Sequence, residues 1–315
     1  MGSDGIQLEN QENLAHTPVL LAEVLEWLHC GPSGAYLDCT VGQGGHAEAI
    51  LARSAPDGIL VGLDRDQQAV DVSRARLRKW GTRAHVMHGH FRDLRGHVES
   101  LDIQRLDGIL FDLGMSSAQL ADPARGFSFQ AEGPLDMRMN SEDATKASDL
   151  VNRRSEQELA DVLYEYGEER YARRIARAIV RRRKESPLTS TTALVDVIRS
   201  AVPASYRHGR IHCATRSFQA LRIAVNRELD DLAGALNDAA DLLSPGGRLC
   251  VVSFHSLEDR IAKQTLRKLS SGDQPVLSVL TKKPVVPSEA ECRDNPRARS
   301  AKLRVAERMV GGKAG

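Results

Sequence analysis

The stretch that decides the fold reads Asp38-Cys39-Thr40-Val41-Gly42-Gln43-Gly44-Gly45-His46-Ala47. It follows a short apolar run, Ala35 to Asp38, and leads into a segment of helical character that begins near His46. Glycines let the backbone approach a ligand closely and tolerate positive φ angles. A buried strand followed by a glycine turn and a helix is typical of nucleotide-binding α/β domains. We therefore expect this turn to hold a cofactor.

The glycine turn alone fits two classes of cofactor. Gly42, Gly44 and Ala47 satisfy the G-x-G-x-x-A form of the dinucleotide fingerprint, so a nicotinamide oxidoreductase is one candidate. Asp38 would repel the pyrophosphate of a dinucleotide, but it would face the positive charges of S-adenosylmethionine favourably. This position therefore favours S-adenosylmethionine, with S-adenosylhomocysteine as product. An Asp that only caps a turn is the alternative for Asp38.

Apolar runs and helical patterns outside this turn predict the rest of the fold. Strands are expected at Gly58 to Leu63, Ala84 to Met87, Gly108 to Leu113, Arg248 to Phe254, Val276 to Leu280 and Leu303 to Met309. Helices are expected at Glu156 to Tyr166, Tyr171 to Lys184, Thr192 to Val202, about Ser217 to Leu243, and Leu257 to Leu269. The alternation predicts an α/β fold, a Rossmann-like doubly wound sheet of about seven strands with an inserted helical domain. Residues 1–117 and 214–315 are assigned to the sheet domain, and 118–213 to the insertion.

Two further residues that follow predicted strands are candidate ligand contacts, Asp64 and Phe91. Asp64 follows the second strand, where a carboxylate can accept both ribose hydroxyls of an adenosine. Asp66, two residues on, is expected to be a solvated helix cap. Phe91 stands in a polar loop after the third strand and could stack on the adenine, with plain packing as the alternative.

Asp112 ends the fourth strand, at the edge where doubly wound folds place reacting groups. It is the candidate catalytic residue, because a hydrogen-bond acceptor beside an exocyclic amine frees the lone pair for attack on a methyl group. A carboxylate that only positions the cofactor is the alternative, and the sequence does not separate the two. No metal is expected, because the leaving group is a neutral thioether and the histidines lack partners at metal-ligand spacing.

Charge balances over the whole chain but not along it. Lys and Arg number 43 against 42 Asp and Glu, whereas residues 170–227 carry 14 basic side chains against two acidic ones. Arg173, Arg177 and Arg181 recur at helical spacing and form a stripe suited to phosphates, which predicts a nucleic-acid partner. A merely solvated helix face is the alternative. The scattered cysteines, the polar start Met1 to Asn13 and the absence of a long apolar run predict a cytoplasmic protein without a membrane partner.

A set of motifs in unbroken order resembles one known family. The motifs are His16 to Leu21, Asp38 to His46, Leu63 to Asp66, Asp112 to Ser117, Arg125 to Phe129, Gly133 to Met139, Tyr166 to Arg170, Ala214 to Ala220, Ser253 to Arg260 and Asn295 to Ser300. Together they resemble the bacterial small-subunit (16S) ribosomal RNA cytosine-N4 methyltransferase family. Cys39 and Cys213 depart from the residues common in that family, glycine and proline.

The resemblance implies more than the residues alone predict. It implies methylation of N4 of a decoding-centre cytidine in 16S rRNA, within the small ribosomal subunit, by a Rossmann-like domain with a helical insertion. It implies the cofactor contacts Gly44, Gly45, His46, Asp64, Phe91, Asp112 and Gln119. A nicotinamide oxidoreductase and a non-catalytic RNA-binding module are the two other classes considered.

Overall fold

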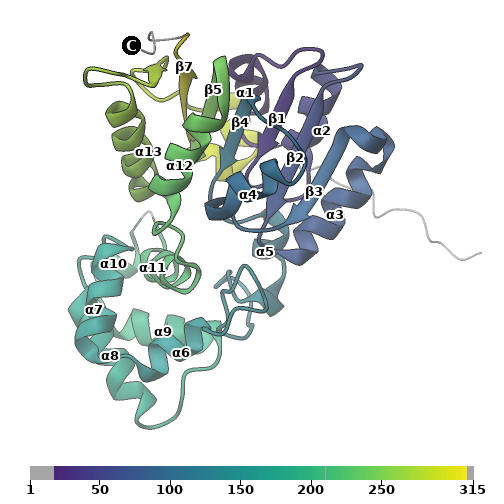
Figure 1. The fold of residues 1–315 in the computed structure, drawn as a ribbon. Coiled ribbons are helices and arrows are strands. Elements are labelled where there is room, and N and C mark those ends of the chain that lie inside the picture. The colour runs from purple at the N-terminus through teal and green to yellow at the C-terminus, as the bar shows by residue number, and fades with distance from the viewer. Residues whose placement is uncertain (1–17, 210, 311–315) are drawn as a thin grey trace, which may run out of the picture.

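A computed structural model describes residues 18–209 and 211–310 of the chain. The Met1 to Asn13 segment and two motif residues, His16 and Thr17, lie outside the described residues. The described chain forms two lobes, a sheet lobe and a smaller helical lobe, which meet at a narrow junction (Figure 1). No helix in the described ranges is both long and apolar enough to cross a membrane.

The sheet lobe contains seven strands in the order β3-β2-β1-β4-β5-β7-β6. Their bounds are Ala35–Asp38 (β1), Ile59–Asp64 (β2), Ala84–His88 (β3), Leu106–Asp112 (β4), Leu243–Ser253 (β5), Leu277–Val279 (β6) and Lys302–Arg308 (β7). Strands β1 to β5 pair in parallel, and β7 is antiparallel to both β5 and β6. The strand order reverses between β1 and β4, where open α/β sheets bind ligands. The predicted fold class and the number of strands are confirmed.

Helices cover both faces of the sheet. Their bounds are Leu21–Leu28 (α1), Gly45–Arg53 (α2), Gln67–Leu77 (α3), Leu94–Glu99 (α4), Leu232–Leu242 (α12) and Ser256–Leu269 (α13). One face packs against α1, α2 and α3 through side chains such as Val24 and Ile50. The other packs against α4, α12 and α13 through side chains such as Leu236 and Leu266. Central strands buried on both faces explain why their sequences are continuously apolar.

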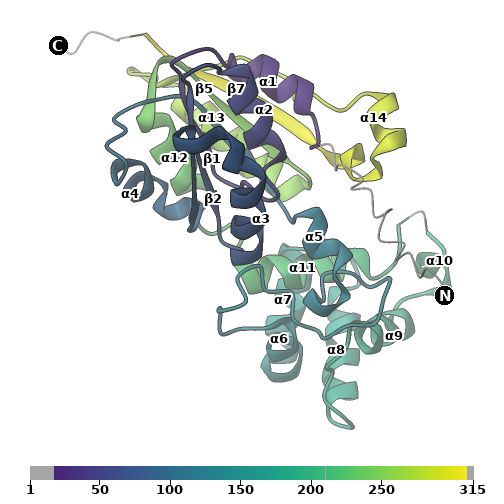
Figure 2. The same ribbon diagram turned by 90° about the vertical axis from the view of Figure 1, so that its right-hand side faces the viewer.

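The helical lobe has a hydrophobic core of its own. Its helices are Ala147–Arg153 (α6), Glu156–Glu165 (α7), Ala172–Arg183 (α8), Thr191–Ala201 (α9), Ala204–Arg207 (α10) and Thr215–Asn226 (α11). The core includes Ile175, Leu194 and, from α11, Phe218 and Leu221. The packing therefore groups α11 with the inserted helices, beyond the boundary at residue 213 that the sequence predicts. Two short helices lie elsewhere: Ser117–Ala121 (α5) is at the junction, and Glu289–Asp294 (α14), late in the chain, is at the side of the sheet lobe (Figure 2).

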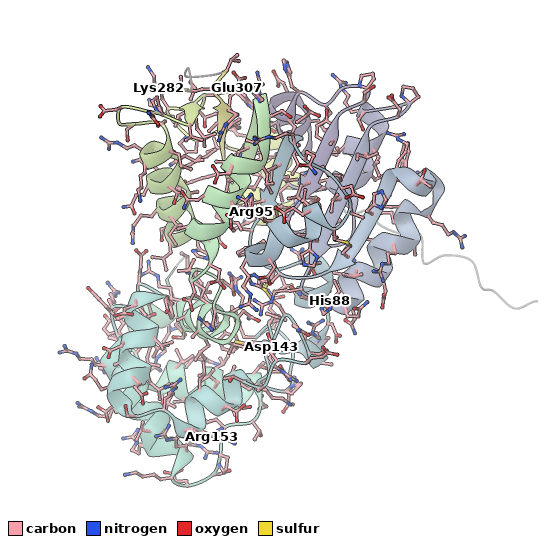
Figure 3. The ribbon with its side chains drawn as sticks, viewed as in Figure 1. His88, Arg95, Asp143, Arg153, Lys282 and Glu307 are labelled. Carbon is pink, nitrogen blue, oxygen red and sulfur yellow. The ribbon has the colours of Figure 1, made fainter. Side chains whose placement is uncertain are left out.

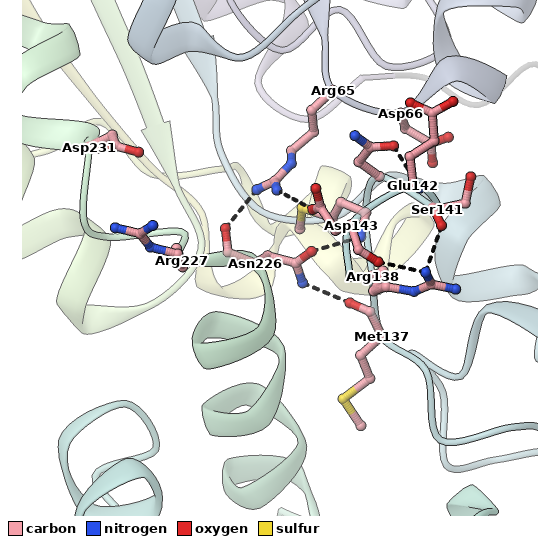
Figure 4. Close-up of polar contacts among 12 residues, drawn as sticks. Arg65, Asp66, Met137, Arg138, Ser141, Glu142, Asp143, Asn226, Arg227 and Asp231 are labelled. Carbon is pink, nitrogen blue, oxygen red and sulfur yellow. Dashed lines mark hydrogen bonds and ion pairs between the residues drawn. The ribbon is translucent and has the colours of Figure 1, made fainter. Parts of the chain in front are cut away.

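The prediction of one long helix from Ser217 to Leu243 is wrong. The segment forms two helices, α11 and α12, because the backbone of Arg227 turns left-handed, with φ 51°. Tertiary hydrogen bonds hold this break. The Asn226 side chain donates to the carbonyl of Met137 and accepts the amide of Met139, both at 2.7 Å (Figure 4). The next strand also begins earlier than predicted, at Leu243 instead of Arg248.

Polar contacts join the two lobes on either side of the junction. Arg65, directly after β2, donates to the backbone carbonyl of Asn226 at 2.7 Å and to the Asp143 carboxylate at 2.8 Å (Figure 4). On the other side, the Glu168 carboxylate accepts from Ser256 at 2.8 Å and from Arg260 at 3.0 Å. Figure 3 places Asp143 near the junction and Arg153 at the far end of the helical lobe.

Candidate active site

A cavity of about 350 Å³ lies where the carboxyl ends of β1, β2, β4 and β5 meet. The glycine turn, the end of β4 and the loop after β5 line it from the sheet lobe. Leu120, Met139 and Arg222 line it from the side of the junction. The cavity thus lies at the reversal of strand order, and it is open to groups from both lobes.

Three aspartates end three neighbouring strands at this edge: Asp38 on β1, Asp64 on β2 and Asp112 on β4. Asp38 is only 1% exposed, and its carboxylate accepts the Thr40 amide at 3.1 Å. Burial raises the pKa of Asp38 to about 7, while the nearby His46 acts in the opposite direction. Asp38 lies beneath the lining of the cavity, so its predicted contact with the cofactor stays a prediction.

Asp64 lines the cavity and also organises the glycine turn. Its two carboxylate oxygens accept the backbone amides of Gly42 at 2.8 Å and of Asp66 at 2.9 Å. Burial raises the pKa of Asp64 to about 6, and these two amides partly offset the effect. A carboxylate held in this way keeps lone pairs for hydroxyl donors, as the predicted ribose contact requires.

The glycines of the turn lie at different depths. Gly45 lines the cavity, and a Cβ at this position would lie 2.5 Å from Cγ of Pro18. Gly44 adopts φ +79° as the residue before α2 and packs against Ser73, behind the cavity wall. A side chain is therefore excluded at Gly45 by space and disfavoured at Gly44 by backbone conformation.

His46 and Asp112 form a buried pair on the cavity wall. His46 Nε2 lies 3.5 Å from Asp112 Oδ2. Burial alone would lower the pKa of His46, but the neighbouring Asp112 and Asp38 carboxylates raise it overall. Both His46 ring nitrogens and Asp112 Oδ1 are buried without a hydrogen-bond partner among the described residues. Buried polar atoms are rarely left unsatisfied, so these atoms fit the charged ends of a bound ligand.

The other predicted contacts also reach the cavity wall. Phe91 lines it and meets Phe111 edge to face, with ring centroids 5.8 Å apart. Gln119 lines it too and donates to Asp66 at 2.8 Å. Asp66 caps α3 as predicted, but the expectation that it is solvated is wrong, because Gln119 and Arg125 bury it to 5% exposure.

Arg222, Glu228, Phe254 and Glu258 are among the lining residues that received no role from the sequence. Arg222 donates to both oxygens of Glu228 at 2.9 Å, and this pair is almost fully buried. Glu228, His255 and Glu258 also bring three potential metal-ligand atoms within 4.8 Å of one another. Both Glu228 oxygens already serve the guanidinium. The Ser253 to Arg260 motif was the only signal that could have directed attention here.

The basic stripe lies outside the cavity. Arg173, Arg177 and Arg181 are exposed on α8, as the helical spacing predicts. Arg177 lies 3.3 Å from Glu156 of α7, an exposed pair that contributes little to stability. None of the three is among the residues that line the cavity.

The strand order with antiparallel β7, the glycine turn and the strand-end aspartates define the class of S-adenosylmethionine-dependent methyltransferases. The chain belongs to the MraW methylase family, whose model matches residues 13–309.

Similar proteins are found over almost the whole chain. A protein of Pelobacter propionicus named Ribosomal RNA small subunit methyltransferase H is 49% identical over 93% of this chain and 98% of its own length. A protein of the same name from Heliobacterium mobile is 50% identical over 93% and 99%.

Solved structures resemble the chain more loosely. An rRNA methylase from Streptococcus thermophilus has a TM-score of 0.41 at 12% identity, covering 92% of this chain and 93% of that one. An O-methyltransferase from Bacillus cereus has a TM-score of 0.43 at 9% identity, covering 92% and 79%.

The raised pKa of Asp38 predicts a pH-dependent stability. A carboxyl whose pKa rises from 3.8 to about 7 on folding makes the protein lose stability as pH increases through that interval. Asp38→Asn removes this titration. The Tm of the variant, measured relative to that of the wild type at the same pH, should therefore increase from pH 5 to pH 8. Asp107→Asn is the control, because Asp107 also accepts a backbone amide, that of Ala35, but is exposed. Parallel Tm curves for wild type and Asp38→Asn would contradict the prediction.

The position of Asp64 predicts a loss of cofactor affinity on neutralisation. Asp64→Asn keeps the shape of the side chain but removes the charge that strengthens hydrogen bonds from ribose hydroxyls. We expect S-adenosylhomocysteine to bind about tenfold more weakly by calorimetry. Asp71→Asn, on the exposed face of α3, should bind as the wild type does. Unchanged affinity in Asp64→Asn would refute the ribose contact.

Proposed function

We propose that the protein methylates the exocyclic N4 of a cytidine in the decoding centre of 16S ribosomal RNA, with S-adenosylmethionine as donor. The proposed cofactor is supported by the row of three strand-end aspartates and by the unsatisfied atoms of His46 and Asp112 beside it. The ribosomal substrate rests on relatives that share about half of this sequence and are named for small-subunit rRNA. The cytosine amine rests on the family resemblance of the motifs.

The cavity residues divide into groups suited to each part of the cofactor. Asp64 would accept the ribose hydroxyls, Phe91 would pack on the adenine, and Gly45 would admit the ligand close to the backbone. His46 and Asp112 would meet the charged methionine end. When bound, S-adenosylmethionine supplies a methyl group attached to a cationic sulfur. The leaving group is the neutral thioether that remains.

Asp112 is the proposed catalytic residue. Its Oδ1 has no hydrogen-bond partner among the described residues, and the Thr40 hydroxyl holds its backbone amide at 2.7 Å. An acceptor fixed in this way can bond one hydrogen of the cytosine amine and turn the nitrogen lone pair out of conjugation. Formation of the new N–C bond leaves one proton in excess on N4, and the Asp112 carboxylate would take it.

The helical lobe is the proposed RNA-binding element. Its helix α8 carries exposed arginines, and the junction next to α11 opens into the cavity. Arginines spaced along one helix face contact successive phosphates without reading sequence. We place the reaction in the cytoplasm, on rRNA within the small ribosomal subunit.

The direct test incubates the protein with methyl-labelled S-adenosylmethionine and small ribosomal subunits, or with free 16S rRNA. Nucleoside analysis of the digested RNA should yield labelled N4-methylcytidine at one position. A second measurement compares stabilisation by S-adenosylhomocysteine with stabilisation by NAD. Label on another nucleoside would overturn the proposed target, and preferential stabilisation by NAD would overturn the class of cofactor.

The exposed stripe on α8 predicts a salt-dependent contribution to RNA binding. Replacing Arg173, Arg177 and Arg181 by Glu should weaken binding to small subunits and reduce the slope of log K against log salt by about 2. The control replaces Arg78, Lys282 and Lys283 by Glu, which are exposed on the sheet lobe and outside the cavity lining. Figure 3 shows Lys282 at the end of the molecule opposite the helical lobe. Equal slopes for the two triple variants would assign α8 to an ordinary solvated face.

A further inference from the structure

The ends of β4 and β5 bring a second set of side chains to the reaction centre. Asp112 is in register with Val252, and the Leu113 amide donates to the Val252 carbonyl at 3.0 Å. The chain that follows β5 therefore passes beside the end of β4. Phe254 and Glu258, on this segment, line the same cavity as Asp112.

Phe254 places an aromatic ring next to the backbone of the β4 loop. Gly114 has φ +91°, and a Cβ there would lie 3.5 Å from the Phe254 ring. The glycine thus keeps the space beside this ring free of a side chain. Phe254 is partly exposed in the cavity, and it also packs against the apolar core beneath the sheet. A fixed, half-covered ring of this kind is a stacking platform for a planar base.

Glu258 is a buried carboxylate with one oxygen available to a donor. Its side chain is 3% exposed, and Oε2 accepts the amides of Phe254 at 2.8 Å and His255 at 3.3 Å. Oε1 lies 3.2 Å from His255 Nε2 and pairs with it. No other described side chain donates to this oxygen. A carboxylate oxygen has two lone pairs, so Oε1 can accept a further hydrogen bond beside its contact with His255.

The neighbours of Glu258 keep it ionised. Burial alone would raise the pKa of Glu258, but His255 and the Arg222 guanidinium bring it below its usual value. Arg222 is itself held in place by its two hydrogen bonds to Glu228. Glu258 therefore faces the cavity as an anion, which accepts hydrogen bonds and donates none.

We propose that Phe254 and Glu258 form the subsite for the target cytosine, with Phe254 stacking on the ring and Glu258 Oε1 accepting one hydrogen of the N4 amine. The inference rests on the proposed function and deepens it. An amine offers two hydrogens, so Asp112 and Glu258 take one each and both favour the lone pair that attacks. Uracil carries an acceptor oxygen in place of the amine, and the Glu258 carboxylate repels it. Glu258 therefore adds to the preference for cytosine over uracil that the Asp112 carboxylate also favours.

The test measures base selection separately from activity. Small subunits are reconstituted with 16S rRNA carrying C or U at the position where labelled N4-methylcytidine is mapped. Filter binding in the presence of S-adenosylhomocysteine then gives both dissociation constants. The wild type should prefer C by about tenfold, because the cytosine amine donates a hydrogen bond to a charged carboxylate and uracil does not. In Glu258→Gln the ratio should fall severalfold, since the amide can turn its NH2 group toward the uracil oxygen while Asp112 keeps its own preference for the amine.

Two other variants separate selection from structure. Glu158→Gln is the matched control, because Glu158 occupies the same capping position in α7 and lies outside the cavity lining, so it should keep the wild-type ratio. Phe254→Leu keeps apolar bulk but loses the stacking face, so it should weaken binding of C and U alike, by about tenfold.

The outcomes are distinct. A C-to-U ratio that stays at the wild-type value in folded Glu258→Gln overturns the assignment of Glu258, and unchanged affinities in Phe254→Leu overturn the stacking role. A wild type without preference for C overturns the subsite altogether. In each of these cases N4-methylcytidine in the wild-type assay would leave the proposed function standing, whereas its absence there would remove the function itself.

Discussion

The site depends on one electrostatic constraint, the crowding of like charge at the carboxyl edge of the sheet. Asp38, Asp64 and Asp112 end adjacent strands, and each is removed from water to a different degree. Desolvation disfavours the ionised forms of Asp38 and Asp64, and the neighbouring Asp112 and Asp64 carboxylates disfavour that of Asp38 further. His46 relieves part of this charge from within the protein. A ligand that carries positive charge and hydroxyl donors relieves more, which gives a physical reason for the match with S-adenosylmethionine.

The inserted lobe completes the cavity instead of merely lying beside it. Helix α11 belongs to the core of that lobe, yet its Arg222 lines the cavity and supports Glu258 electrostatically. The Arg65 and Glu168 contacts hold the two lobes together on either side. The cavity can therefore not be described from the sheet lobe alone, because part of its wall comes from the helical lobe.

The sequence predicted what is local in the chain and missed what depends on distant contacts. The strand-end aspartates and the glycine turn could be predicted because each strand, turn and helix is continuous in sequence. The break at Arg227 could not, because no proline or glycine marks it and the hydrogen bonds of Asn226 reach back to Met137. The burial of Asp66 depends on partners more than 50 residues away. Glu258 received no role from the sequence, because only the neighbouring strand ends place it in the cavity.

Asp64 and Arg65 are consecutive residues that serve different lobes. One holds the glycine turn and lines the cavity, and the other anchors the helical lobe through Asn226 and Asp143. A ligand that favoured one arrangement of this strand tip over another would also favour one orientation of the lobe that carries the arginine stripe, because Asp64 and Arg65 are consecutive. Thermodynamic linkage then requires reciprocity: an RNA that favours the same orientation would raise the affinity for the methyl donor by the factor by which the donor raises the affinity for RNA. Binding of the RNA and binding of the methyl donor are in that case thermodynamically coupled.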